Sequence, residues 1–244
     1  MLKRHALFTL IFLLIVAVNI FAQFDVVSGL DMFVKPLICI SLAIYLLRNA
    51  NMAAGFNRLT LAALILSLLG DCFLLFAADG NSLFIFGLVA FLTAHILYSL
   101  AFFRDFKNDP QASKIYGHLM LFLMGVFSLS FYTWIREYLN DLRIPVMAYM
   151  FVISIMAILA GYRYRRVNLL SFRLIYFGAI FFVVSDSSLA YNKFVEPFPY
   201  STAVIIATYM IAQYLIVMGA VERANYLKVF TAPSTLSHKA VECS

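Results

Sequence analysis

Between residues 6 and 22 the chain reads ALFTLIFLLIVAVNIFA, without one charged side chain. A run of this kind is close to the roughly 20 apolar residues with which a helix crosses a bilayer. The whole chain of 244 residues has the same character, because 64% of it is hydrophobic and 12% is charged. Soluble domains are nearer about 45–50% apolar and about 25% charged. The composition therefore predicts an integral membrane protein and excludes an ordinary soluble domain.

Apolar runs bounded by charges and turn residues predict an all-α membrane protein with eight transmembrane helices. Strands of a membrane barrel would alternate apolar and polar side chains, and these runs do not. Lys3 and Arg4 before the first run imitate a secretory signal, but Ile20 does not suit a cleavage site, so we expect an uncleaved span. We expect one transmembrane domain over residues 1–244, with a C-terminal tail at 224–244. The predicted spans are 6–22, 33–47, 59–77, 83–103, 117–133, 144–161, 172–191 and 201–220.

The basic residues predict how these helices are oriented. Fourteen of the eighteen Lys and Arg residues fall in the two terminal segments and the even-numbered loops, when Arg173 at the start of the seventh span is counted with the loop before it. Cytoplasmic loops carry such an excess, so both termini are expected in the cytoplasm, and in the inner (plasma) membrane if the chain is bacterial. The net charge of +6 then reflects topology, and no nucleic-acid partner is expected. We interpret the cluster Arg163, Arg165, Arg166 and Arg173 as a topological anchor rather than a binding site.

A weak internal similarity relates the two halves of the chain. LLGDCFLL around Asp71 resembles VVSDSSLA around Asp186, and LTAHILY around His95 matches MIAQYLI around Gln213 in order. Counting residues from the outer helix ends places both aspartates about 8–9 Å deep and both His95 and Gln213 about 18 Å deep. Two interpretations stay open, namely chance similarity among apolar helices and two parallel four-helix repeats. The repeat halves would be residues 1–104 and 117–223.

Asp71 and Asp186 are the only acidic residues inside the predicted spans. A charged group at the bilayer centre costs about 2.5–3.5 kcal/mol, so such residues face the bundle interior and mark functional sites. Interhelical hydrogen bonding alone is the weaker explanation, because no Lys or Arg lies in mid-span to pair with them. Only Lys35 and Lys193, near the outer ends of their spans, are placed to reach inward.

Two carboxyl groups in an apolar bundle suit acid–base chemistry. Such a group can be protonated near neutrality, and two close together separate into one acid and one base. This favours cleavage of an ether, acetal or enol-ether bond with water as the nucleophile. The sequence has no His-x-x-x-His or Glu-x-x-His pair, no G-x-S-x-G elbow and no nucleotide-binding glycine motif. Hence no metal ion and no organic cofactor are expected.

Five short motifs, in order along residues 33–220, resemble those of the YhhN family of eight-helix membrane proteins, which includes lysoplasmalogenases. Each motif is weak alone, and the ordered set with the matching number of helices is more specific. The motifs are Lys35-Pro36-Leu37, Gly70-Asp71-x-x-Leu74, Ala94-His95-x-x-Tyr98, Ser185-Asp186-x-x-Leu189-Ala190 and Tyr209-x-x-x-Gln213.

The resemblance implies hydrolysis of the vinyl ether bond of a lysoplasmalogen, which gives a fatty aldehyde and glycerophosphocholine or glycerophosphoethanolamine. The partner is then a lysophospholipid within the bilayer, while the oligomeric state stays open. Asp71, Asp186 and His95 are the expected catalytic residues. Lysines at the rim suit a phosphate, and aromatic rings suit a choline. The expected substrate-binding residues are Lys35, Tyr98, Tyr149, Lys193, Tyr209 and Gln213.

Two other classes of protein fit the same residues. Paired membrane acids and parallel repeats also suit a small transporter or proton-coupled carrier. A protein that binds lipid without cleaving it is the third alternative. Transport into sealed vesicles without product would favour the carrier, and recovery of intact lysolipid would favour the binding protein.

Overall fold

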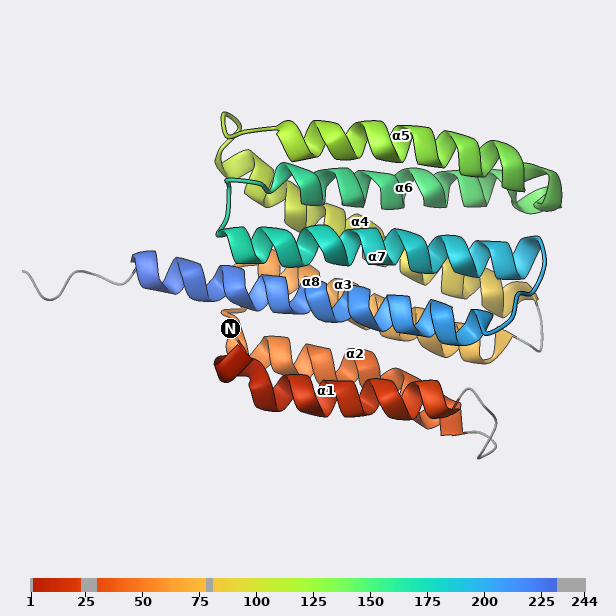
Figure 1. Cartoon of the computed structure of the whole chain (residues 1–244), viewed down its shortest axis with the longest axis horizontal. Coiled ribbons are helices and arrows are strands. Elements are labelled where there is room, and N and C mark those ends of the chain that lie inside the picture. The colour runs from red at the N-terminus through yellow and green to blue at the C-terminus, as the bar shows by residue number, and fades with distance from the viewer. Residues whose placement is uncertain (1, 23–29, 78–80, 232–244) are drawn as a thin grey trace, which may run out of the picture.

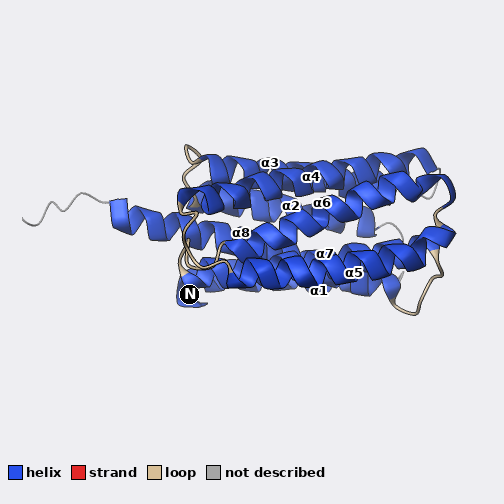
Figure 2. Cartoon of the chain, turned by 90° about the horizontal axis from the view of Figure 1, so that it is seen from above, coloured by secondary structure: helices blue, strands red, loops and turns tan. Residues whose placement is uncertain are grey.

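The computed structural model describes residues 2–22, 30–77 and 81–231 as eight α-helices and two short 3₁₀ turns, with no strand in those ranges. The helices run along one common axis (Figure 1), as the view from above also shows (Figure 2). The 3₁₀ turns, Arg136–Tyr138 and Asn140–Leu142, connect α5 to α6. The helices are α1 (Leu2–Ala22), α2 (Leu30–Asn49), α3 (Gly55–Leu75), α4 (Asn81–Asn108), α5 (Ile115–Ile135), α6 (Arg143–Tyr162), α7 (Leu169–Phe194) and α8 (Ser201–Thr231).

All eight apolar runs fold as helices, which confirms the all-α prediction. In the part of the chain that the structure describes, seven helices, all but α2, are long and apolar enough to cross a membrane. The chain is therefore a multi-pass integral membrane protein. Helix α8 continues past the predicted span to Thr231, so the start of the predicted tail at 224 is helical, because Ala224 is still buried in the bundle. Residues 232–244 of that tail lie outside the described residues.

The helices α3, α4, α7 and α8 form the middle of the bundle, with α1 and α2 along one edge and α5 and α6 along the other (Figure 1). Helices α7 and α8 approach closely through two glycines. A Cβ atom at Gly178 would lie 3.1 Å from the carbonyl oxygen of Ala212, and one at Gly219 would lie 3.1 Å from that of Ser171. The Ser171 hydroxyl donates to the Gly219 carbonyl at 2.7 Å, which ties the two helices together.

A buried ion cluster joins α4, α6 and α8 at the end of the bundle where α1 begins. Nε of Arg163 lies 2.9 Å from Oδ2 of Asp105, and an Arg223 guanidinium nitrogen lies 2.5 Å from Oδ1. Arg163 also donates to the Ser171 hydroxyl at 3.0 Å. Burial lowers the pKa of the Arg163 guanidinium, and the charge of Asp105 opposes that shift.

The burial of Arg163 is a feature that the prediction of a topological anchor did not include. Arg163 is fully buried, and Asp105 is 1% exposed. The reason is that α4 and α8 continue beyond the predicted spans, so Asp105 and Arg223 meet Arg163 inside packed helix ends. A buried charge is stable only when it is paired and hydrogen-bonded, and this cluster provides both.

We predict that Asp105→Asn destabilises the bundle strongly, because it leaves two guanidinium groups without a countercharge. Removing one partner of a buried ion pair costs about 3–5 kcal/mol. The measurement is the thermal unfolding midpoint of the purified protein in detergent. Lys107→Gln, an exposed charge change on the same helix, is the control. An Asp105→Asn protein that unfolds at the same temperature as this control would contradict the prediction.

Candidate functional site

The two membrane aspartates line one cavity, which we call the polar vestibule. It has a volume of about 990 Å³ and lies among α2, α3, α4, α7 and α8. Lys35 and Lys193 line it as well, so two carboxyl groups and two ammonium groups border the same space. Its other lining residues include Leu74, Phe84, Phe91, Leu189, Asn192 and Tyr209.

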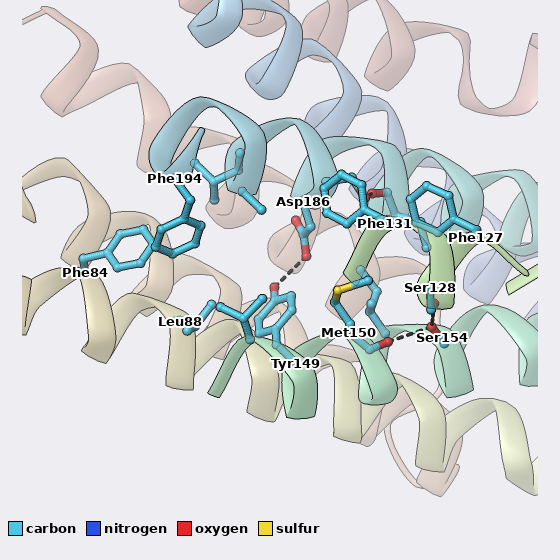
Figure 3. A pocket seen from close by; sticks show the side chains of 16 residues that line it. Phe84, Leu88, Phe127, Ser128, Phe131, Tyr149, Met150, Ser154, Asp186 and Phe194 are labelled. Carbon is cyan, nitrogen blue, oxygen red and sulfur yellow. Dashed lines mark hydrogen bonds between the residues drawn. The ribbon is translucent and has the colours of Figure 1, made fainter. Parts of the chain in front are cut away.

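A second cavity, the apolar chamber, has a volume of about 600 Å³ and lies among α4, α5, α6 and α7 (Figure 3). Asp186 and Tyr149 form a polar spot on a wall that is otherwise nearly all hydrocarbon. The chamber shares Phe84, Asp186 and Leu189 with the vestibule. Asp186 therefore lies where the polar space and the apolar space meet. The chamber walls include Leu88, Phe127, Phe131, Met150, Ile153 and Val183.

Asp71, on α3, is held by side chains of α2 and α8. The Tyr209 hydroxyl donates to its Oδ2 at 2.7 Å, and the Cys39 thiol lies 3.7 Å from the same atom. Nζ of Lys35 lies 4.0 Å from Oδ1, and the Asp71 side chain is 2% exposed. Lys35 thus reaches inward to the first aspartate, as the sequence predicted.

Asp186, on α7, is held by side chains of α6 and α4. The Tyr149 hydroxyl donates to its Oδ2 at 2.6 Å (Figure 3), and Nε2 of His95 donates to the same oxygen at 2.9 Å. Among the described residues, the buried Nδ1 of His95 has no hydrogen-bond partner. An orphaned buried N–H is rarer than an orphaned acceptor, which favours the tautomer with its proton on Nε2. His95 therefore orients Asp186.

The structure brings His95 to Asp186, a contact that the sequence did not predict. Counting along the helices set His95 about 9–10 Å deeper than Asp186, whereas the structure brings the two side chains into direct contact. Figure 1 shows the reason, because α4 runs obliquely behind α6 and α7 rather than parallel to them. Distance along a tilted helix does not measure depth relative to a neighbour.

The remaining predicted residues divide into two groups. Tyr98 and Gln213 are fully buried, and the Tyr98 hydroxyl donates to Oε1 of Gln213 at 2.7 Å. Nε2 of Gln213 donates to the Tyr209 hydroxyl at 3.3 Å, so this pair supports the partner of Asp71 from behind and lines neither cavity. Nζ of Lys193 lies 4.9 Å from the centre of the Phe84 ring, at the wall of the vestibule.

Sequence reasoning missed several residues of the site, among them Cys39 and Phe84. Cys39 lies four residues after Lys35 and so on the same face of α2, a helical spacing that offered a signal. Its Sγ lies 3.1 Å from the Tyr209 hydroxyl oxygen. Phe84 borders both cavities, but one phenylalanine among 25 carries no sequence signal. Only the fold identifies it.

The arrangement is suited to proton transfer within the helix bundle, at the cavity that both carboxyl groups line. Two carboxyl groups, each with one hydroxyl donor, face a cavity that also holds two ammonium groups. Within the described ranges, no three His, Cys, Asp or Glu side chains come together as ligands for a metal ion. The chemistry that these side chains can supply themselves is general acid and base catalysis with electrostatic stabilisation of a cation.

Comparison with known proteins gives the family. The model of the YhhN family matches residues 30–220. This chain belongs to the YhhN family. The matched segment contains both aspartates, His95 and every partner of these residues described above.

Several relatives of this YhhN protein are named lysoplasmalogenase. Human lysoplasmalogenase TMEM86A is 33% identical over 163 residues, which cover 65% of this chain and 63% of that protein. Human lysoplasmalogenase TMEM86B is 29% identical over 195 residues, 76% of this chain and 72% of the relative. The pig lysoplasmalogenase TMEM86B is 30% identical over 193 residues, 79% and 76% of the two chains. The match thus spans less than two thirds of the length of TMEM86A, and no solved structure matches the chain.

We predict that Tyr98→Phe lowers stability, because it leaves the buried Oε1 of Gln213 without its donor. An unsatisfied buried acceptor costs about 1–3 kcal/mol. The measurement is the thermal unfolding midpoint in detergent, with Tyr200→Phe at a tyrosine that is 73% exposed as the matched control. Equal midpoints for the two variants would show that the Tyr98 hydroxyl does not support the bundle.

Proposed function

We propose that this chain is a lysoplasmalogenase, which adds water across the vinyl ether bond of a single-chain alkenyl glycerophospholipid. The relatives named lysoplasmalogenase support this proposal, because their matches cover 65% and 76% of this chain. The observation that carries it is the position of Asp186 at the junction of the vestibule and the chamber. A vinyl ether bond lies at such a junction in the substrate, between a polar head and a hydrocarbon chain.

The proposed reaction needs one acid, one carboxylate and one water molecule. The acid protonates the vinyl carbon farther from the ether oxygen, which converts the double bond into an oxocarbenium ion. Water then adds to the carbon bonded to oxygen and loses a proton to a carboxylate, forming a hemiacetal. The hemiacetal breaks its bond to the glycerol oxygen, and the products are a fatty aldehyde and the free glycerol hydroxyl. The proposal calls for no metal ion or organic cofactor.

The surroundings of the two aspartates suggest different roles. Asp186 borders the chamber, so it is placed to reach a carbon atom of the chain, and His95 and Tyr149 fix its position. Asp71 borders only the vestibule and lies beside the Lys35 ammonium. We therefore assign the acid to Asp186 and assign Asp71 to stabilising the cation and orienting the water.

The head group would occupy the vestibule. Lys35 and Lys193 are suited to hold its phosphate oxygens, since ammonium groups bind phosphate as point charges. The aromatic wall residues Phe91 and Tyr209 are suited to a choline, whose cation is attracted by ring faces. Water reaches the carboxyl groups from this side, which is the more polar of the two cavities.

We also propose the finer topology that the sequence predicted, namely eight spans with both termini in the cytoplasm. Figure 1 supports a common side, because α1 begins where α8 ends. The two aspartates support a repeat of four helices. Asp71 of α3 contacts residues of α2 and α8, and Asp186 of α7 contacts residues of α6 and α4. When the half α1–α4 is exchanged with the half α5–α8, the helices that contact Asp71 become the helices that contact Asp186.

Reporter fusions test the topology. We predict that a reporter protein that fluoresces only in the cytoplasm is fluorescent when it is fused to either terminus. The reason is that an even number of spans returns the chain to the side of the membrane on which it started. A fusion in the loop between α5 and α6, beside Asp141, is the control and is expected to be dark. A dark fusion at one terminus and a bright one at the other would overturn the eight-span topology.

The function is tested by aldehyde release from an alkenyl lysophospholipid, with matched alkyl and acyl lysolipids as substrate controls. We predict that the purified protein releases aldehyde from the alkenyl lipid alone. Asp71→Asn and Asp186→Asn are each expected to lower kcat by at least about 100-fold, the usual contribution of general acid–base catalysis.

Controls separate chemistry from folding in this assay. Asp141→Asn, an exposed acid between α5 and α6, should keep wild-type turnover. If both site variants fold and keep wild-type turnover, the catalytic assignment fails. If the wild-type protein releases no aldehyde, the proposed function itself fails.

A further inference from the structure

The apolar chamber extends away from the junction with the vestibule toward the middle of the bundle. On α6 it follows one face from Val146 through Tyr149 and Ile153 to Ser154. At about 1.5 Å per residue, Ser154 lies about 7–8 Å farther along α6 than Tyr149. The hydrocarbon chain of a membrane lipid also runs from the polar interface toward the middle of the bilayer. The chamber therefore has the direction that such a chain takes.

Two serines whose hydroxyl groups bind each other line the inner end of the chamber. The hydroxyl oxygens of Ser128 and Ser154 lie 2.8 Å apart, and that of Ser154 donates to the Met150 carbonyl at 2.6 Å (Figure 3). Because these hydroxyl groups already have hydrogen-bond partners within the protein, they do not require one from a bound molecule. The end wall is suited to methylene groups, although two serines form it.

The chamber also opens sideways between α5 and α7. A groove of about 970 Å³ separates these helices and is lined by apolar residues of both. It shares Phe127, Phe131, Val183 and Ser187 with the chamber. Helix α5 has few buried side chains and packs mainly on α6. It contacts α7 through Tyr116 near one end and Trp134 near the other, and the groove lies between these two contacts. The groove is an apolar path from the lipid into the chamber.

We propose that the chamber binds the hydrocarbon chain of the substrate, and that this chain enters from the bilayer through the groove between α5 and α7. The occupant is one unbranched chain, since the wall of the chamber is nearly all hydrocarbon and the groove that leads to it is lined mainly by apolar side chains. The position of the reacting bond beside Asp186 rests on the proposed function. Binding of the chain itself does not.

Photolabelling tests the binding without requiring turnover. The probe is an alkyl lysophospholipid with a diazirine in the middle of its chain, incorporated into vesicles that contain the full-length protein. We expect labelled residues on the facing sides of α5, α6 and α7, among them Phe127, Ile153 and Val183. An excess of unlabelled alkyl lysophospholipid should suppress this labelling. Labelling confined to the outer surface of the bundle, or unaffected by the competitor, would overturn the proposal.

A substitution at the inner end tests the length of the chamber. Ser154→Phe places a ring where the end of a long chain would lie, and filling occupied space of this kind costs enough to weaken binding about 10-fold or more. The labelling should fall by that factor, and kcat/KM should fall for a long alkenyl chain and change little for a chain of half the length. An equal loss for both chains would contradict a chain that extends to Ser154.

Two further variants keep the test decisive. Ser128→Phe fills the same end from the more loosely packed α5 and replaces Ser154→Phe if that protein does not fold. Ser130→Phe makes the same substitution on α5 at an exposed residue that lines neither the chamber nor the groove, so it should leave labelling and turnover unchanged. Aldehyde release without chamber labelling would overturn this inference and support the proposed function. Chamber labelling without aldehyde release would support this inference and overturn the proposed function.

Discussion

A carboxyl group inside a bilayer must find its partners within the protein, because the lipid offers none. In this chain Asp71 and Asp186 are two such groups, and four other helices supply their partners. Side chains of α2 and α8 hold Asp71, and side chains of α6 and α4 hold Asp186. These contacts join most of the bundle at one level. They also position the reactive groups.

The same contacts divide the interior into two environments. On one side of Asp186 lies a vestibule with Lys35 and Lys193, and on the other lies a chamber of hydrocarbon side chains. A soluble enzyme would need a lid to keep a lipid chain from water, whereas in the proposed complex the helices themselves would separate the chain from the polar head. The proposed hydrolysis uses this division directly, since its acid must reach a carbon atom while its water comes from the polar side.

Much of this structure could be predicted from the sequence, since apolar runs specify membrane helices and acids inside such runs are rare. Every predicted site residue lies in or behind the vestibule or beside Asp186. What could not be predicted depends on helix tilt and helix length. The contact between His95 and Asp186 follows from the oblique path of α4, and the pairing of Arg163 with Asp105 follows from helices longer than their apolar cores. Apolar wall residues such as Phe84 are recognised only in three dimensions.

In the proposed reaction a carboxylic acid of the bundle protonates a carbon atom of the substrate, and hydrolysis in D₂O is the direct test of this step. The aldehyde is reduced to the alcohol as it forms, which prevents later exchange, and its deuterium content is measured by mass spectrometry and NMR. The account predicts one deuterium on the carbon next to the former carbonyl carbon, delivered to a single face of the double bond. Aldehyde without deuterium at that carbon, or with equal labelling of both faces, would contradict protonation by a residue of the site.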